Sequence, residues 1–291
     1  MKISILSSAF MLDGYNIEQC ISIAKELGYD AIDICTWEPH LEPRIYGKRK
    51  RKELLELARS YDIEIGQIVT FGWECSEPIA ALRAATIKYM KERLELAWDL
   101  EAKCVEYIPG WTRPDLPREK TWRWAVEVYK KVVKYAEDVG IPIAAEFEPL
   151  QPWMQMWGKP RPLNVHTIDL LVKFASELGS DYSKVNLDLG HCYIAKATYD
   201  DFKKVKEYVI YTHCNDNDGV TDLNLPPGRG KVPFATYFRW LHEIGYDGFI
   251  GIELEGVENS KDLAKESYEY VKSILVQLGF YGTYKDPFRR D

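Results

Sequence analysis

Short β-rich runs alternate with long amphipathic segments along the whole of this 291-residue chain. Eight runs have the length and residue types of strands, and a helical pattern follows each of them. The strand runs cover residues 2–7, 31–35, 64–70, 104–108, 141–148, 184–189, 208–213 and 248–253. The helical patterns cover residues 17–27, 48–60, 78–100, 119–139, 165–178, 199–207, 234–244 and 261–278. Eight successive βα units favour a closed parallel (β/α)8 barrel, whose usual size is about 250 residues.

Glycines mark the ends of three helical patterns, at Gly28, Gly140 and Gly245. A glycine here takes the left-handed conformation that stops a helix. The rival fold is an open doubly wound sheet, which would be expected to carry a G-x-G-x-x-G turn after an early strand. The sequence contains no such motif. We therefore predict one barrel domain over residues 1–281 and a polar C-terminal tail over residues 282–291, which would be a terminal arm or an oligomer contact.

Charge and composition exclude several classes of protein. The net charge of −7 counts against non-specific binding to nucleic acid. No apolar run approaches the roughly 20 residues that span a bilayer, and the first residues lack the pattern of a signal peptide. None of the six cysteines forms a C-x-x-C pair, which disfavours a zinc ribbon. We expect a cytoplasmic protein with reduced thiols that binds neither membrane nor nucleic acid.

The last four predicted strands each end in a residue that can bind a metal. These residues are Glu148, Asp188, His213 and Glu253. In a (β/α)8 barrel the active site lies at the carboxyl ends of the strands, and buried charges there need a partner or a cation. Three carboxylates and one imidazole suit one divalent ion such as Mn²⁺, Mg²⁺ or Co²⁺, with Zn²⁺ a further candidate. The alternative is a set of exposed charges at the strand ends.

Two of these strands offer a choice of ligand. Glu146 and Glu148 share one face because side chains alternate along a strand, and so do Glu253 and Glu255. We prefer Glu148, at the junction with the following loop, and Glu253, at the end of an apolar run. Glu146 is expected to lie deeper, where it would support the site or contact the substrate. Its alternative role is a salt bridge inside the barrel.

The ordered set of motifs resembles the xylose-isomerase-like barrel superfamily, and within it the sugar isomerase and ketose 3-epimerase branch. The resemblance covers nearly the whole chain, and each motif alone is weak. The motifs are Gly28-Tyr29-Asp30-Ala31-Ile32-Asp33-Ile34, Glu148-Pro149-Leu150, Asp188-Leu189-Gly190-His191, His213 with Asp216, Pro227-Gly228-Arg229-Gly230, and Gly245-Tyr246-Asp247-Gly248 leading to Glu253.

The resemblance implies an enzyme that binds a ketose through a divalent metal. The metal would make the C–H next to the carbonyl more acidic. Glu148 and Glu253, both also metal ligands, would remove and return the proton on opposite faces of a cis-enediolate. His191 would bind a substrate hydroxyl or carbonyl, although it could instead be a buried helix-capping residue. Family members are often dimers or tetramers, so a homo-oligomer is expected.

The chain departs from the family pattern at two positions. A second glutamate is expected about six residues after the strand-5 ligand, and Met154 stands there instead. The basic residue expected shortly after His213 is absent, since Asn217, Asp218 and Gly219 occupy that segment. Arg229 could supply the missing positive charge, or it could be an exposed loop residue. These departures leave epimerase and isomerase both open.

Tryptophans are plentiful after the second to fifth predicted strands. Trp37 and Trp111 are candidates to pack against the C–H face of a sugar, and the simpler alternative is packing within a lid. The same fold also hosts lyases such as inosose-type dehydratases, which begin with the same proton abstraction. An endonuclease-IV-like DNA repair enzyme would need more histidines than the five present. A non-catalytic sugar-binding barrel is a further alternative.

Overall fold

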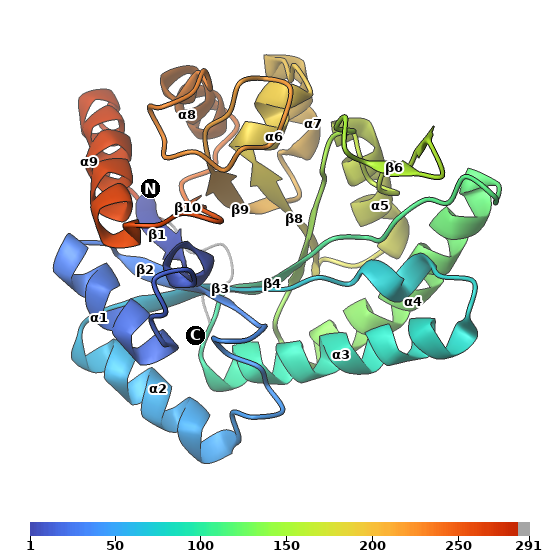
Figure 1. The fold of residues 1–291 in the computed structure, drawn as a ribbon, viewed down its shortest axis with the longest axis horizontal. Coiled ribbons are helices and arrows are strands. Elements are labelled where there is room, and N and C mark those ends of the chain that lie inside the picture. The colour runs from blue at the N-terminus through green and yellow to red at the C-terminus, as the bar shows by residue number, and fades with distance from the viewer. Residues whose placement is uncertain (285–291) are drawn as a thin grey trace.

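Eight parallel strands close into a barrel in the computed structural model, which describes residues 1–284 (Figure 1). The strands are β1 (Lys2–Leu6), β2 (Ala31–Cys35), β3 (Glu64–Val69), β4 (Cys104–Tyr107), β5 (Ile143–Glu146), β8 (Ser183–Asp188), β9 (Val209–Cys214) and β10 (Phe249–Ile252). Around the barrel they follow the order β1, β10, β9, β8, β5, β4, β3, β2. The predicted (β/α)8 barrel is confirmed.

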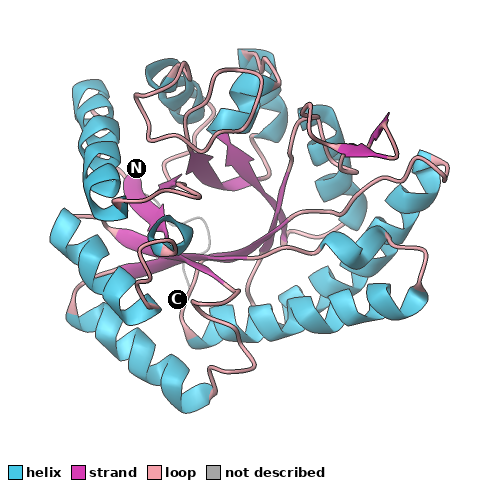
Figure 2. Ribbon diagram, viewed as in Figure 1, coloured by secondary structure: helices cyan, strands magenta, loops and turns pink. Residues whose placement is uncertain are grey.

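Helices form a ring outside the strands (Figure 2). They are α1 (Ile17–Leu27), α2 (Lys48–Ser60), α3 (Ala80–Asp99), α4 (Arg118–Val139), α5 (Ile168–Leu178), α6 (Leu189–Ile194), α7 (Tyr199–Val205), α8 (Phe234–Glu243) and α9 (Ser260–Leu278). Each long helix turns an apolar face toward the barrel; in α9, Val271 and Leu275 are fully buried. Gly28 and Gly140 end α1 and α4 with φ of 90° and 78°, as the sequence predicts.

The sequence pattern does not predict α6, which begins directly after β8. The carboxylate of Asp188 accepts a hydrogen bond from the backbone N–H of His191 at 2.5 Å and so caps this helix. The turn that starts α6 therefore fixes Asp188 and His191 relative to each other at the end of β8.

A polar cluster lies inside the barrel beneath the strand ends. The carboxylate of Asp33 accepts hydrogen bonds from the hydroxyls of Tyr211 (2.5 Å) and Ser4 (2.7 Å). Side chains of β9 alternate, so His213 lies on the same face as Tyr211, one step closer to the carboxyl end. Gly66 has no room for a Cβ atom against Tyr211 and Asp33. The barrel interior is thus a tightly fitted support for the residues above it.

Two long loops cross the carboxyl ends of the strands. The loop after β5 contains the two-stranded hairpin of β6 (Gln155–Met156) and β7 (Lys159–Pro160). The loop after β9 runs to α8, and the backbone N–H of its Asp222 donates a hydrogen bond to the side-chain oxygen of Gln151 at 2.8 Å. The two loops are therefore joined over one side of the barrel mouth, by which we mean the opening at the carboxyl ends of the strands.

The predicted tail, residues 282–291, lies mostly outside the described residues. Within its described part, the backbone N–H of Gly282 donates to the carbonyl of Met1 at 2.9 Å, and the Thr283 hydroxyl accepts from the N-terminal amine at 2.8 Å. Across residues 1–284, the structure contains no helix with the length and apolar character that crossing a membrane requires.

Candidate active site

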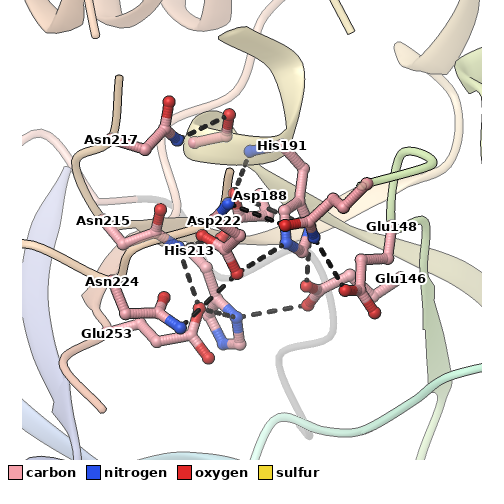
Figure 3. A network of polar contacts seen from close by, with 12 residues as sticks. Glu146, Glu148, Asp188, His191, His213, Asn215, Asn217, Asp222, Asn224 and Glu253 are labelled. Carbon is pink, nitrogen blue, oxygen red and sulfur yellow. Dashed lines mark hydrogen bonds and ion pairs between the residues drawn. The ribbon is translucent and has the colours of Figure 1, made fainter. Parts of the chain in front are cut away.

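Four neighbouring strands deliver polar side chains to one side of the barrel mouth. The strands β5, β8, β9 and β10 are adjacent in the barrel, and Asp188 lies directly opposite His213 in the pairing of β8 with β9. Glu146 is the last residue of β5, and Glu253 follows the last residue of β10. Figure 3 shows the side chain of His213 between Glu253 on one side and Glu146 on the other.

Glu146, Asp188 and His213 form a potential metal site. One ligand atom from each lies within 4.8 Å of the others, and all three residues are buried. The Nδ1 atom of His213 lies 3.2 Å from a carboxylate oxygen of Glu146 and 3.4 Å from one of Glu253. This nitrogen is buried and makes no hydrogen bond, which is unusual for a buried polar atom. The donor set of carboxylate oxygens and one imidazole nitrogen fits a divalent cation.

Amide side chains hold these donors in place. Asn215 donates hydrogen bonds to Asp188 at 2.8 Å and to Glu253 at 3.1 Å. Gln67 contacts Nε2 of His213, which leaves Nδ1 facing the carboxylates, and Asn186 donates to Glu146. Such outer contacts orient metal ligands. The sequence pattern does not single out these amides, although Asn186 and Asn215 each stand two residues from a predicted ligand.

The structure groups a carboxylate oxygen of Glu146, and not of Glu148, with the ligand atoms of Asp188 and His213. The choice of Glu148 as the metal ligand stays a prediction. Strand β5 ends at Glu146, so Glu148 already belongs to the loop, and its backbone N–H bonds to the carbonyl of Val165 at 3.2 Å. The carboxylate of Glu148 instead accepts a hydrogen bond from Gln151 at 2.9 Å. In the strand register Glu146 lies opposite Asn186, two residues before Asp188, and its side chain reaches up to within 3.2 Å of Nδ1 of His213.

His191 lies among three carboxylates. Its Nδ1 atom is 3.2 Å from Glu146 and 3.8 Å from Asp188, and its Nε2 atom is 3.3 Å from Asp222. The structure therefore places His191 beside Glu146 and Asp188, and its contact with a substrate stays a prediction. The sequence pattern does not single out Asp222, because the loop that carries it has no periodic pattern.

Burial and neighbouring charges shift the pKa values of these groups. Burial raises the pKa of Glu148 to about 7, with help from the charges of Asp222 and Glu146. Burial would also raise the pKa of Glu146, but His213 and His191 outweigh it and hold that pKa at about 2. Burial, and then the charge of Glu146, raise the pKa of Asp188. Such crowding of buried carboxylates is what a bound cation would relieve.

Aromatic side chains line the opposite side of the mouth, after β2, β3, β4 and β5. We call this row the aromatic arc; it comprises Trp37, Phe71, Trp73, Trp111 and Trp153. From each ring to the next in this order, the centroids lie 4.7, 4.6, 6.0 and 6.2 Å apart. The indole N–H of Trp153 donates a hydrogen bond to the side-chain oxygen of Gln151 at 3.1 Å. The side-chain amide of the same Gln151 donates to Glu148. The predicted Trp37 and Trp111 thus lie in one arc, whose Trp153 end adjoins the polar side.

One expected substrate contact, Arg229, lies away from the polar side of the mouth. Arg229 forms a bidentate ion pair with Glu266 on α9, in which its Nε and Nη2 atoms lie 2.7 and 2.6 Å from the two carboxylate oxygens. The Arg229 side chain is about half exposed. The structure therefore does not bring Arg229 to the carboxylates, because a closer acidic partner holds it. Met154, at the position of the family's second glutamate, is buried, and its sulfur accepts from the backbone N–H of Gln151.

The fold and this set of side chains define a barrel enzyme with its polar centre at the carboxyl ends of β5, β8, β9 and β10. The model of the xylose isomerase-like TIM barrel family matches residues 21–274, and the chain belongs to that family.

Relatives with assigned activities are similar over most of their length. A fructoselysine 3-epimerase of Escherichia coli O157:H7 is 25% identical, covering 82% of this chain and 85% of the relative. An inosose isomerase of Bacillus velezensis is 24% identical, covering 91% and 93%. The solved structure of the IOLI protein, which holds a zinc atom, superposes with a TM-score of 0.78 at 21% identity and covers 96% of this chain and 98% of that one. The chain is thus an enzyme of the isomerase and epimerase class.

Proposed function

We propose that this enzyme is a divalent-metal-dependent ketose 3-epimerase. The observation that carries the proposal is the placement of Glu146 and Glu253 on either side of His213, from β5 and β10. These are the outer two of the four adjacent strands, so their carboxylates approach the centre from different directions (Figure 3). Inversion at carbon needs one base on each face of the substrate, and this arrangement offers two.

Glu146, Asp188, His213 and Glu253 would hold the cation. When bound, the cation supplies Lewis acidity, which makes the C–H beside a ketone easier to ionise. Mn²⁺, Mg²⁺ and Co²⁺ suit three carboxylates and one imidazole, and the zinc atom in the related IOLI structure keeps Zn²⁺ as a candidate.

The side chains of this chain would carry out the remaining steps. A carboxylate oxygen of Glu253 or Glu146 would take the proton from C3, and the other glutamate would return a proton to the opposite face. The Nε2 atom of His191, beside Asp222, would bind a substrate hydroxyl. The joined loops at Gln151 and Asp222 would limit the entry of water.

Deuterium exchange tests this proposal directly. Protein loaded with Mn²⁺ is incubated in D2O with a panel of ketohexoses and ketopentoses, and the products are analysed by NMR and mass spectrometry. We expect deuterium at C3 together with the C3 epimer. Label at C1 or C2 with an aldose product would show an isomerase, and a product that has lost water would show a lyase. Either result, or no exchange with any ketose, would overturn the epimerase proposal.

A further inference from the structure

Two side chains of the loop after β9 carry buried oxygen atoms that receive no hydrogen bond. They are Oδ1 of Asp222 and Oδ1 of Asn224, and neither has a donor within residues 1–284. Buried polar atoms are nearly always hydrogen-bonded, because an atom that has lost its water and gained no partner is costly. In residues 216–233, these are the only side-chain atoms that are buried without a partner. They therefore mark a place where a donor group from outside the chain would bind.

Both side chains lie beside the proposed metal centre. The Oδ2 atom of Asp222 lies 3.3 Å from Nε2 of His191, and Nδ1 of the same imidazole lies 3.2 Å from Glu146. The side-chain amide of Asn224 donates a hydrogen bond to Oδ2 of Asp222 at 3.4 Å (Figure 3). A single imidazole thus separates the two unpaired oxygens from a proposed metal ligand, so a polyol held at the metal could extend to them.

The backbone around these two residues is held in place from two directions. Asp216 and Leu225 form an antiparallel bridge, with hydrogen bonds of 2.8 and 2.9 Å, which closes the loop around residues 217–224. The backbone N–H of Asp222 donates to the side-chain oxygen of Gln151 at 2.8 Å, and the amide of Gln151 donates to Glu148 at 2.9 Å. The unpaired oxygens are therefore presented without further ordering of the loop, which favours the affinity for a ligand.

Other side chains of the long loops are already engaged. Met154 is buried and has no hydroxyl-binding oxygen. Arg229 is paired with Glu266, and the side-chain amide of Asn217 donates to the carbonyl of Gly190 at 3.0 Å. None of these three side chains offers a free acceptor beside the metal centre, unlike the two unpaired oxygens.

The two unpaired atoms match the hydroxyl groups of a sugar. A carboxylate oxygen and an amide oxygen are both hydrogen-bond acceptors, and a hydroxyl group is a donor that can approach either of them. A site built around buried acceptors rejects an analogue that lacks the hydroxyl, because the acceptors are then left unpaired. The loop after β9 can therefore select among ketoses by hydroxyl groups away from the reacting carbon.

We propose that Asp222 and Asn224 are specificity-determining residues, which bind hydroxyl groups of the substrate that take no part in the proton transfer. The inference rests on the proposed function for the presence of a ketose at the metal centre. It adds the residues that recognise the rest of the carbon chain. This recognition lies on a loop that Gln151 holds, and not on the strands that carry the proposed metal ligands.

Analogues of fructose that each lack one hydroxyl test the inference. The affinities of D-fructose and of its deoxy analogues at C1, C4, C5 and C6 for Mn²⁺-loaded protein are measured by calorimetry. We expect at least one analogue to bind about tenfold or more weakly than fructose, which is the weight of a hydrogen bond to a buried acceptor. In Asp222→Ala or Asn224→Gly the same analogue should lose less than about twofold relative to fructose, because the acceptor that recognised the hydroxyl is gone.

The variants are chosen so that the fold is retained. Glycine readily adopts the φ of 45° found at Asn224, so Asn224→Gly removes the side chain without straining the backbone. Leu223→Ala is the matched control, because it removes an exposed side chain between the two proposed residues, and it should leave the penalty for each missing hydroxyl unchanged. The melting temperature and the Mn²⁺ affinity of each variant check the fold and the metal centre. Comparing one ligand across the proteins cancels any difference between ligands in their open-chain fraction.

Several results would overturn the inference. One is a penalty for the missing hydroxyl that stays the same in the parent, Asp222→Ala and Asn224→Gly. Another is a parent that binds no fructose, or that binds fructose and all its analogues equally. If both variants weaken every ligand by the same factor, the two residues act on the fold and not on a hydroxyl group. Exchange of deuterium at C3 without this coupling refutes the inference alone, whereas coupling without exchange refutes the proposed function alone.

Discussion

Glu253→Gln is expected to slow deuterium exchange at C3 by about a thousandfold, within the range by which general acid–base groups contribute to catalysis. Glutamine has the same length and keeps an oxygen that can accept the hydrogen bond from Asn215, so the fold should be retained. It cannot take or return a proton on its side of the substrate. The exchange rate with a saturating ketose measures the effect, and the melting temperature checks the fold.

The control for this variant is Glu258→Gln, which removes an exposed carboxylate from the same loop. Its exchange rate should match that of the unmodified enzyme. A Glu253→Gln protein that folds, binds metal and keeps more than about a tenth of the exchange rate would remove Glu253 from the proton-transfer pair.

Asp188→Asn is expected to abolish the stabilisation that a divalent ion confers. At a free Mn²⁺ concentration a hundred times the Kd, binding stabilises a folded protein by about 2.7 kcal/mol. For a chain of this size, that corresponds to a rise in melting temperature of roughly 5–10 °C. Asparagine can still cap α6, as asparagine is a good N-cap residue, so the metal-free variant should melt near the temperature of the metal-free parent.

Thermal melts with and without Mn²⁺ measure this effect in both proteins. Asp200→Asn, which removes an exposed carboxylate away from the site, is the matched control and should keep the full stabilisation by Mn²⁺. If Asp188→Asn gains the same stabilisation from Mn²⁺ as the parent, Asp188 is not a ligand.

The barrel could be predicted because its signals are local and repeated. Each strand run is short and apolar, and glycines such as Gly28 and Gly140 end the helices that separate them. Asp188, His213 and Glu253 could be placed together because the carboxyl ends of adjacent parallel strands meet at one end of a barrel. That inference needs only the order of the strands.

The choice between Glu146 and Glu148 depends on where β5 stops. Alternation puts both on the same face, so the pattern cannot separate them. The pairing with β8 ends at Glu146 opposite Asn186, and the chain then leaves the barrel to bond Val165. The end of a strand is set by contacts between segments, which a single sequence does not display.

The sequence pattern does not predict where the side chains of the long loops lie. Asp222 reaches His191 from a loop without periodicity, and a hydrogen bond to Gln151 in another loop holds its backbone. Arg229 lies in the same loop, yet it turns outward because Glu266 of α9 offers a bidentate partner. Both outcomes depend on contacts between parts of the chain far apart in sequence.

The most direct test of the metal centre is a calorimetric titration of metal-stripped protein with Mn²⁺, for the parent, Glu146→Gln and Glu148→Gln. We expect one ion per chain in the parent, loss of at least about a hundredfold in affinity in Glu146→Gln, and a change of only a few-fold in Glu148→Gln. Strong binding that survives in Glu146→Gln but disappears in Glu148→Gln would contradict the site described here, and so would a parent protein that binds no ion.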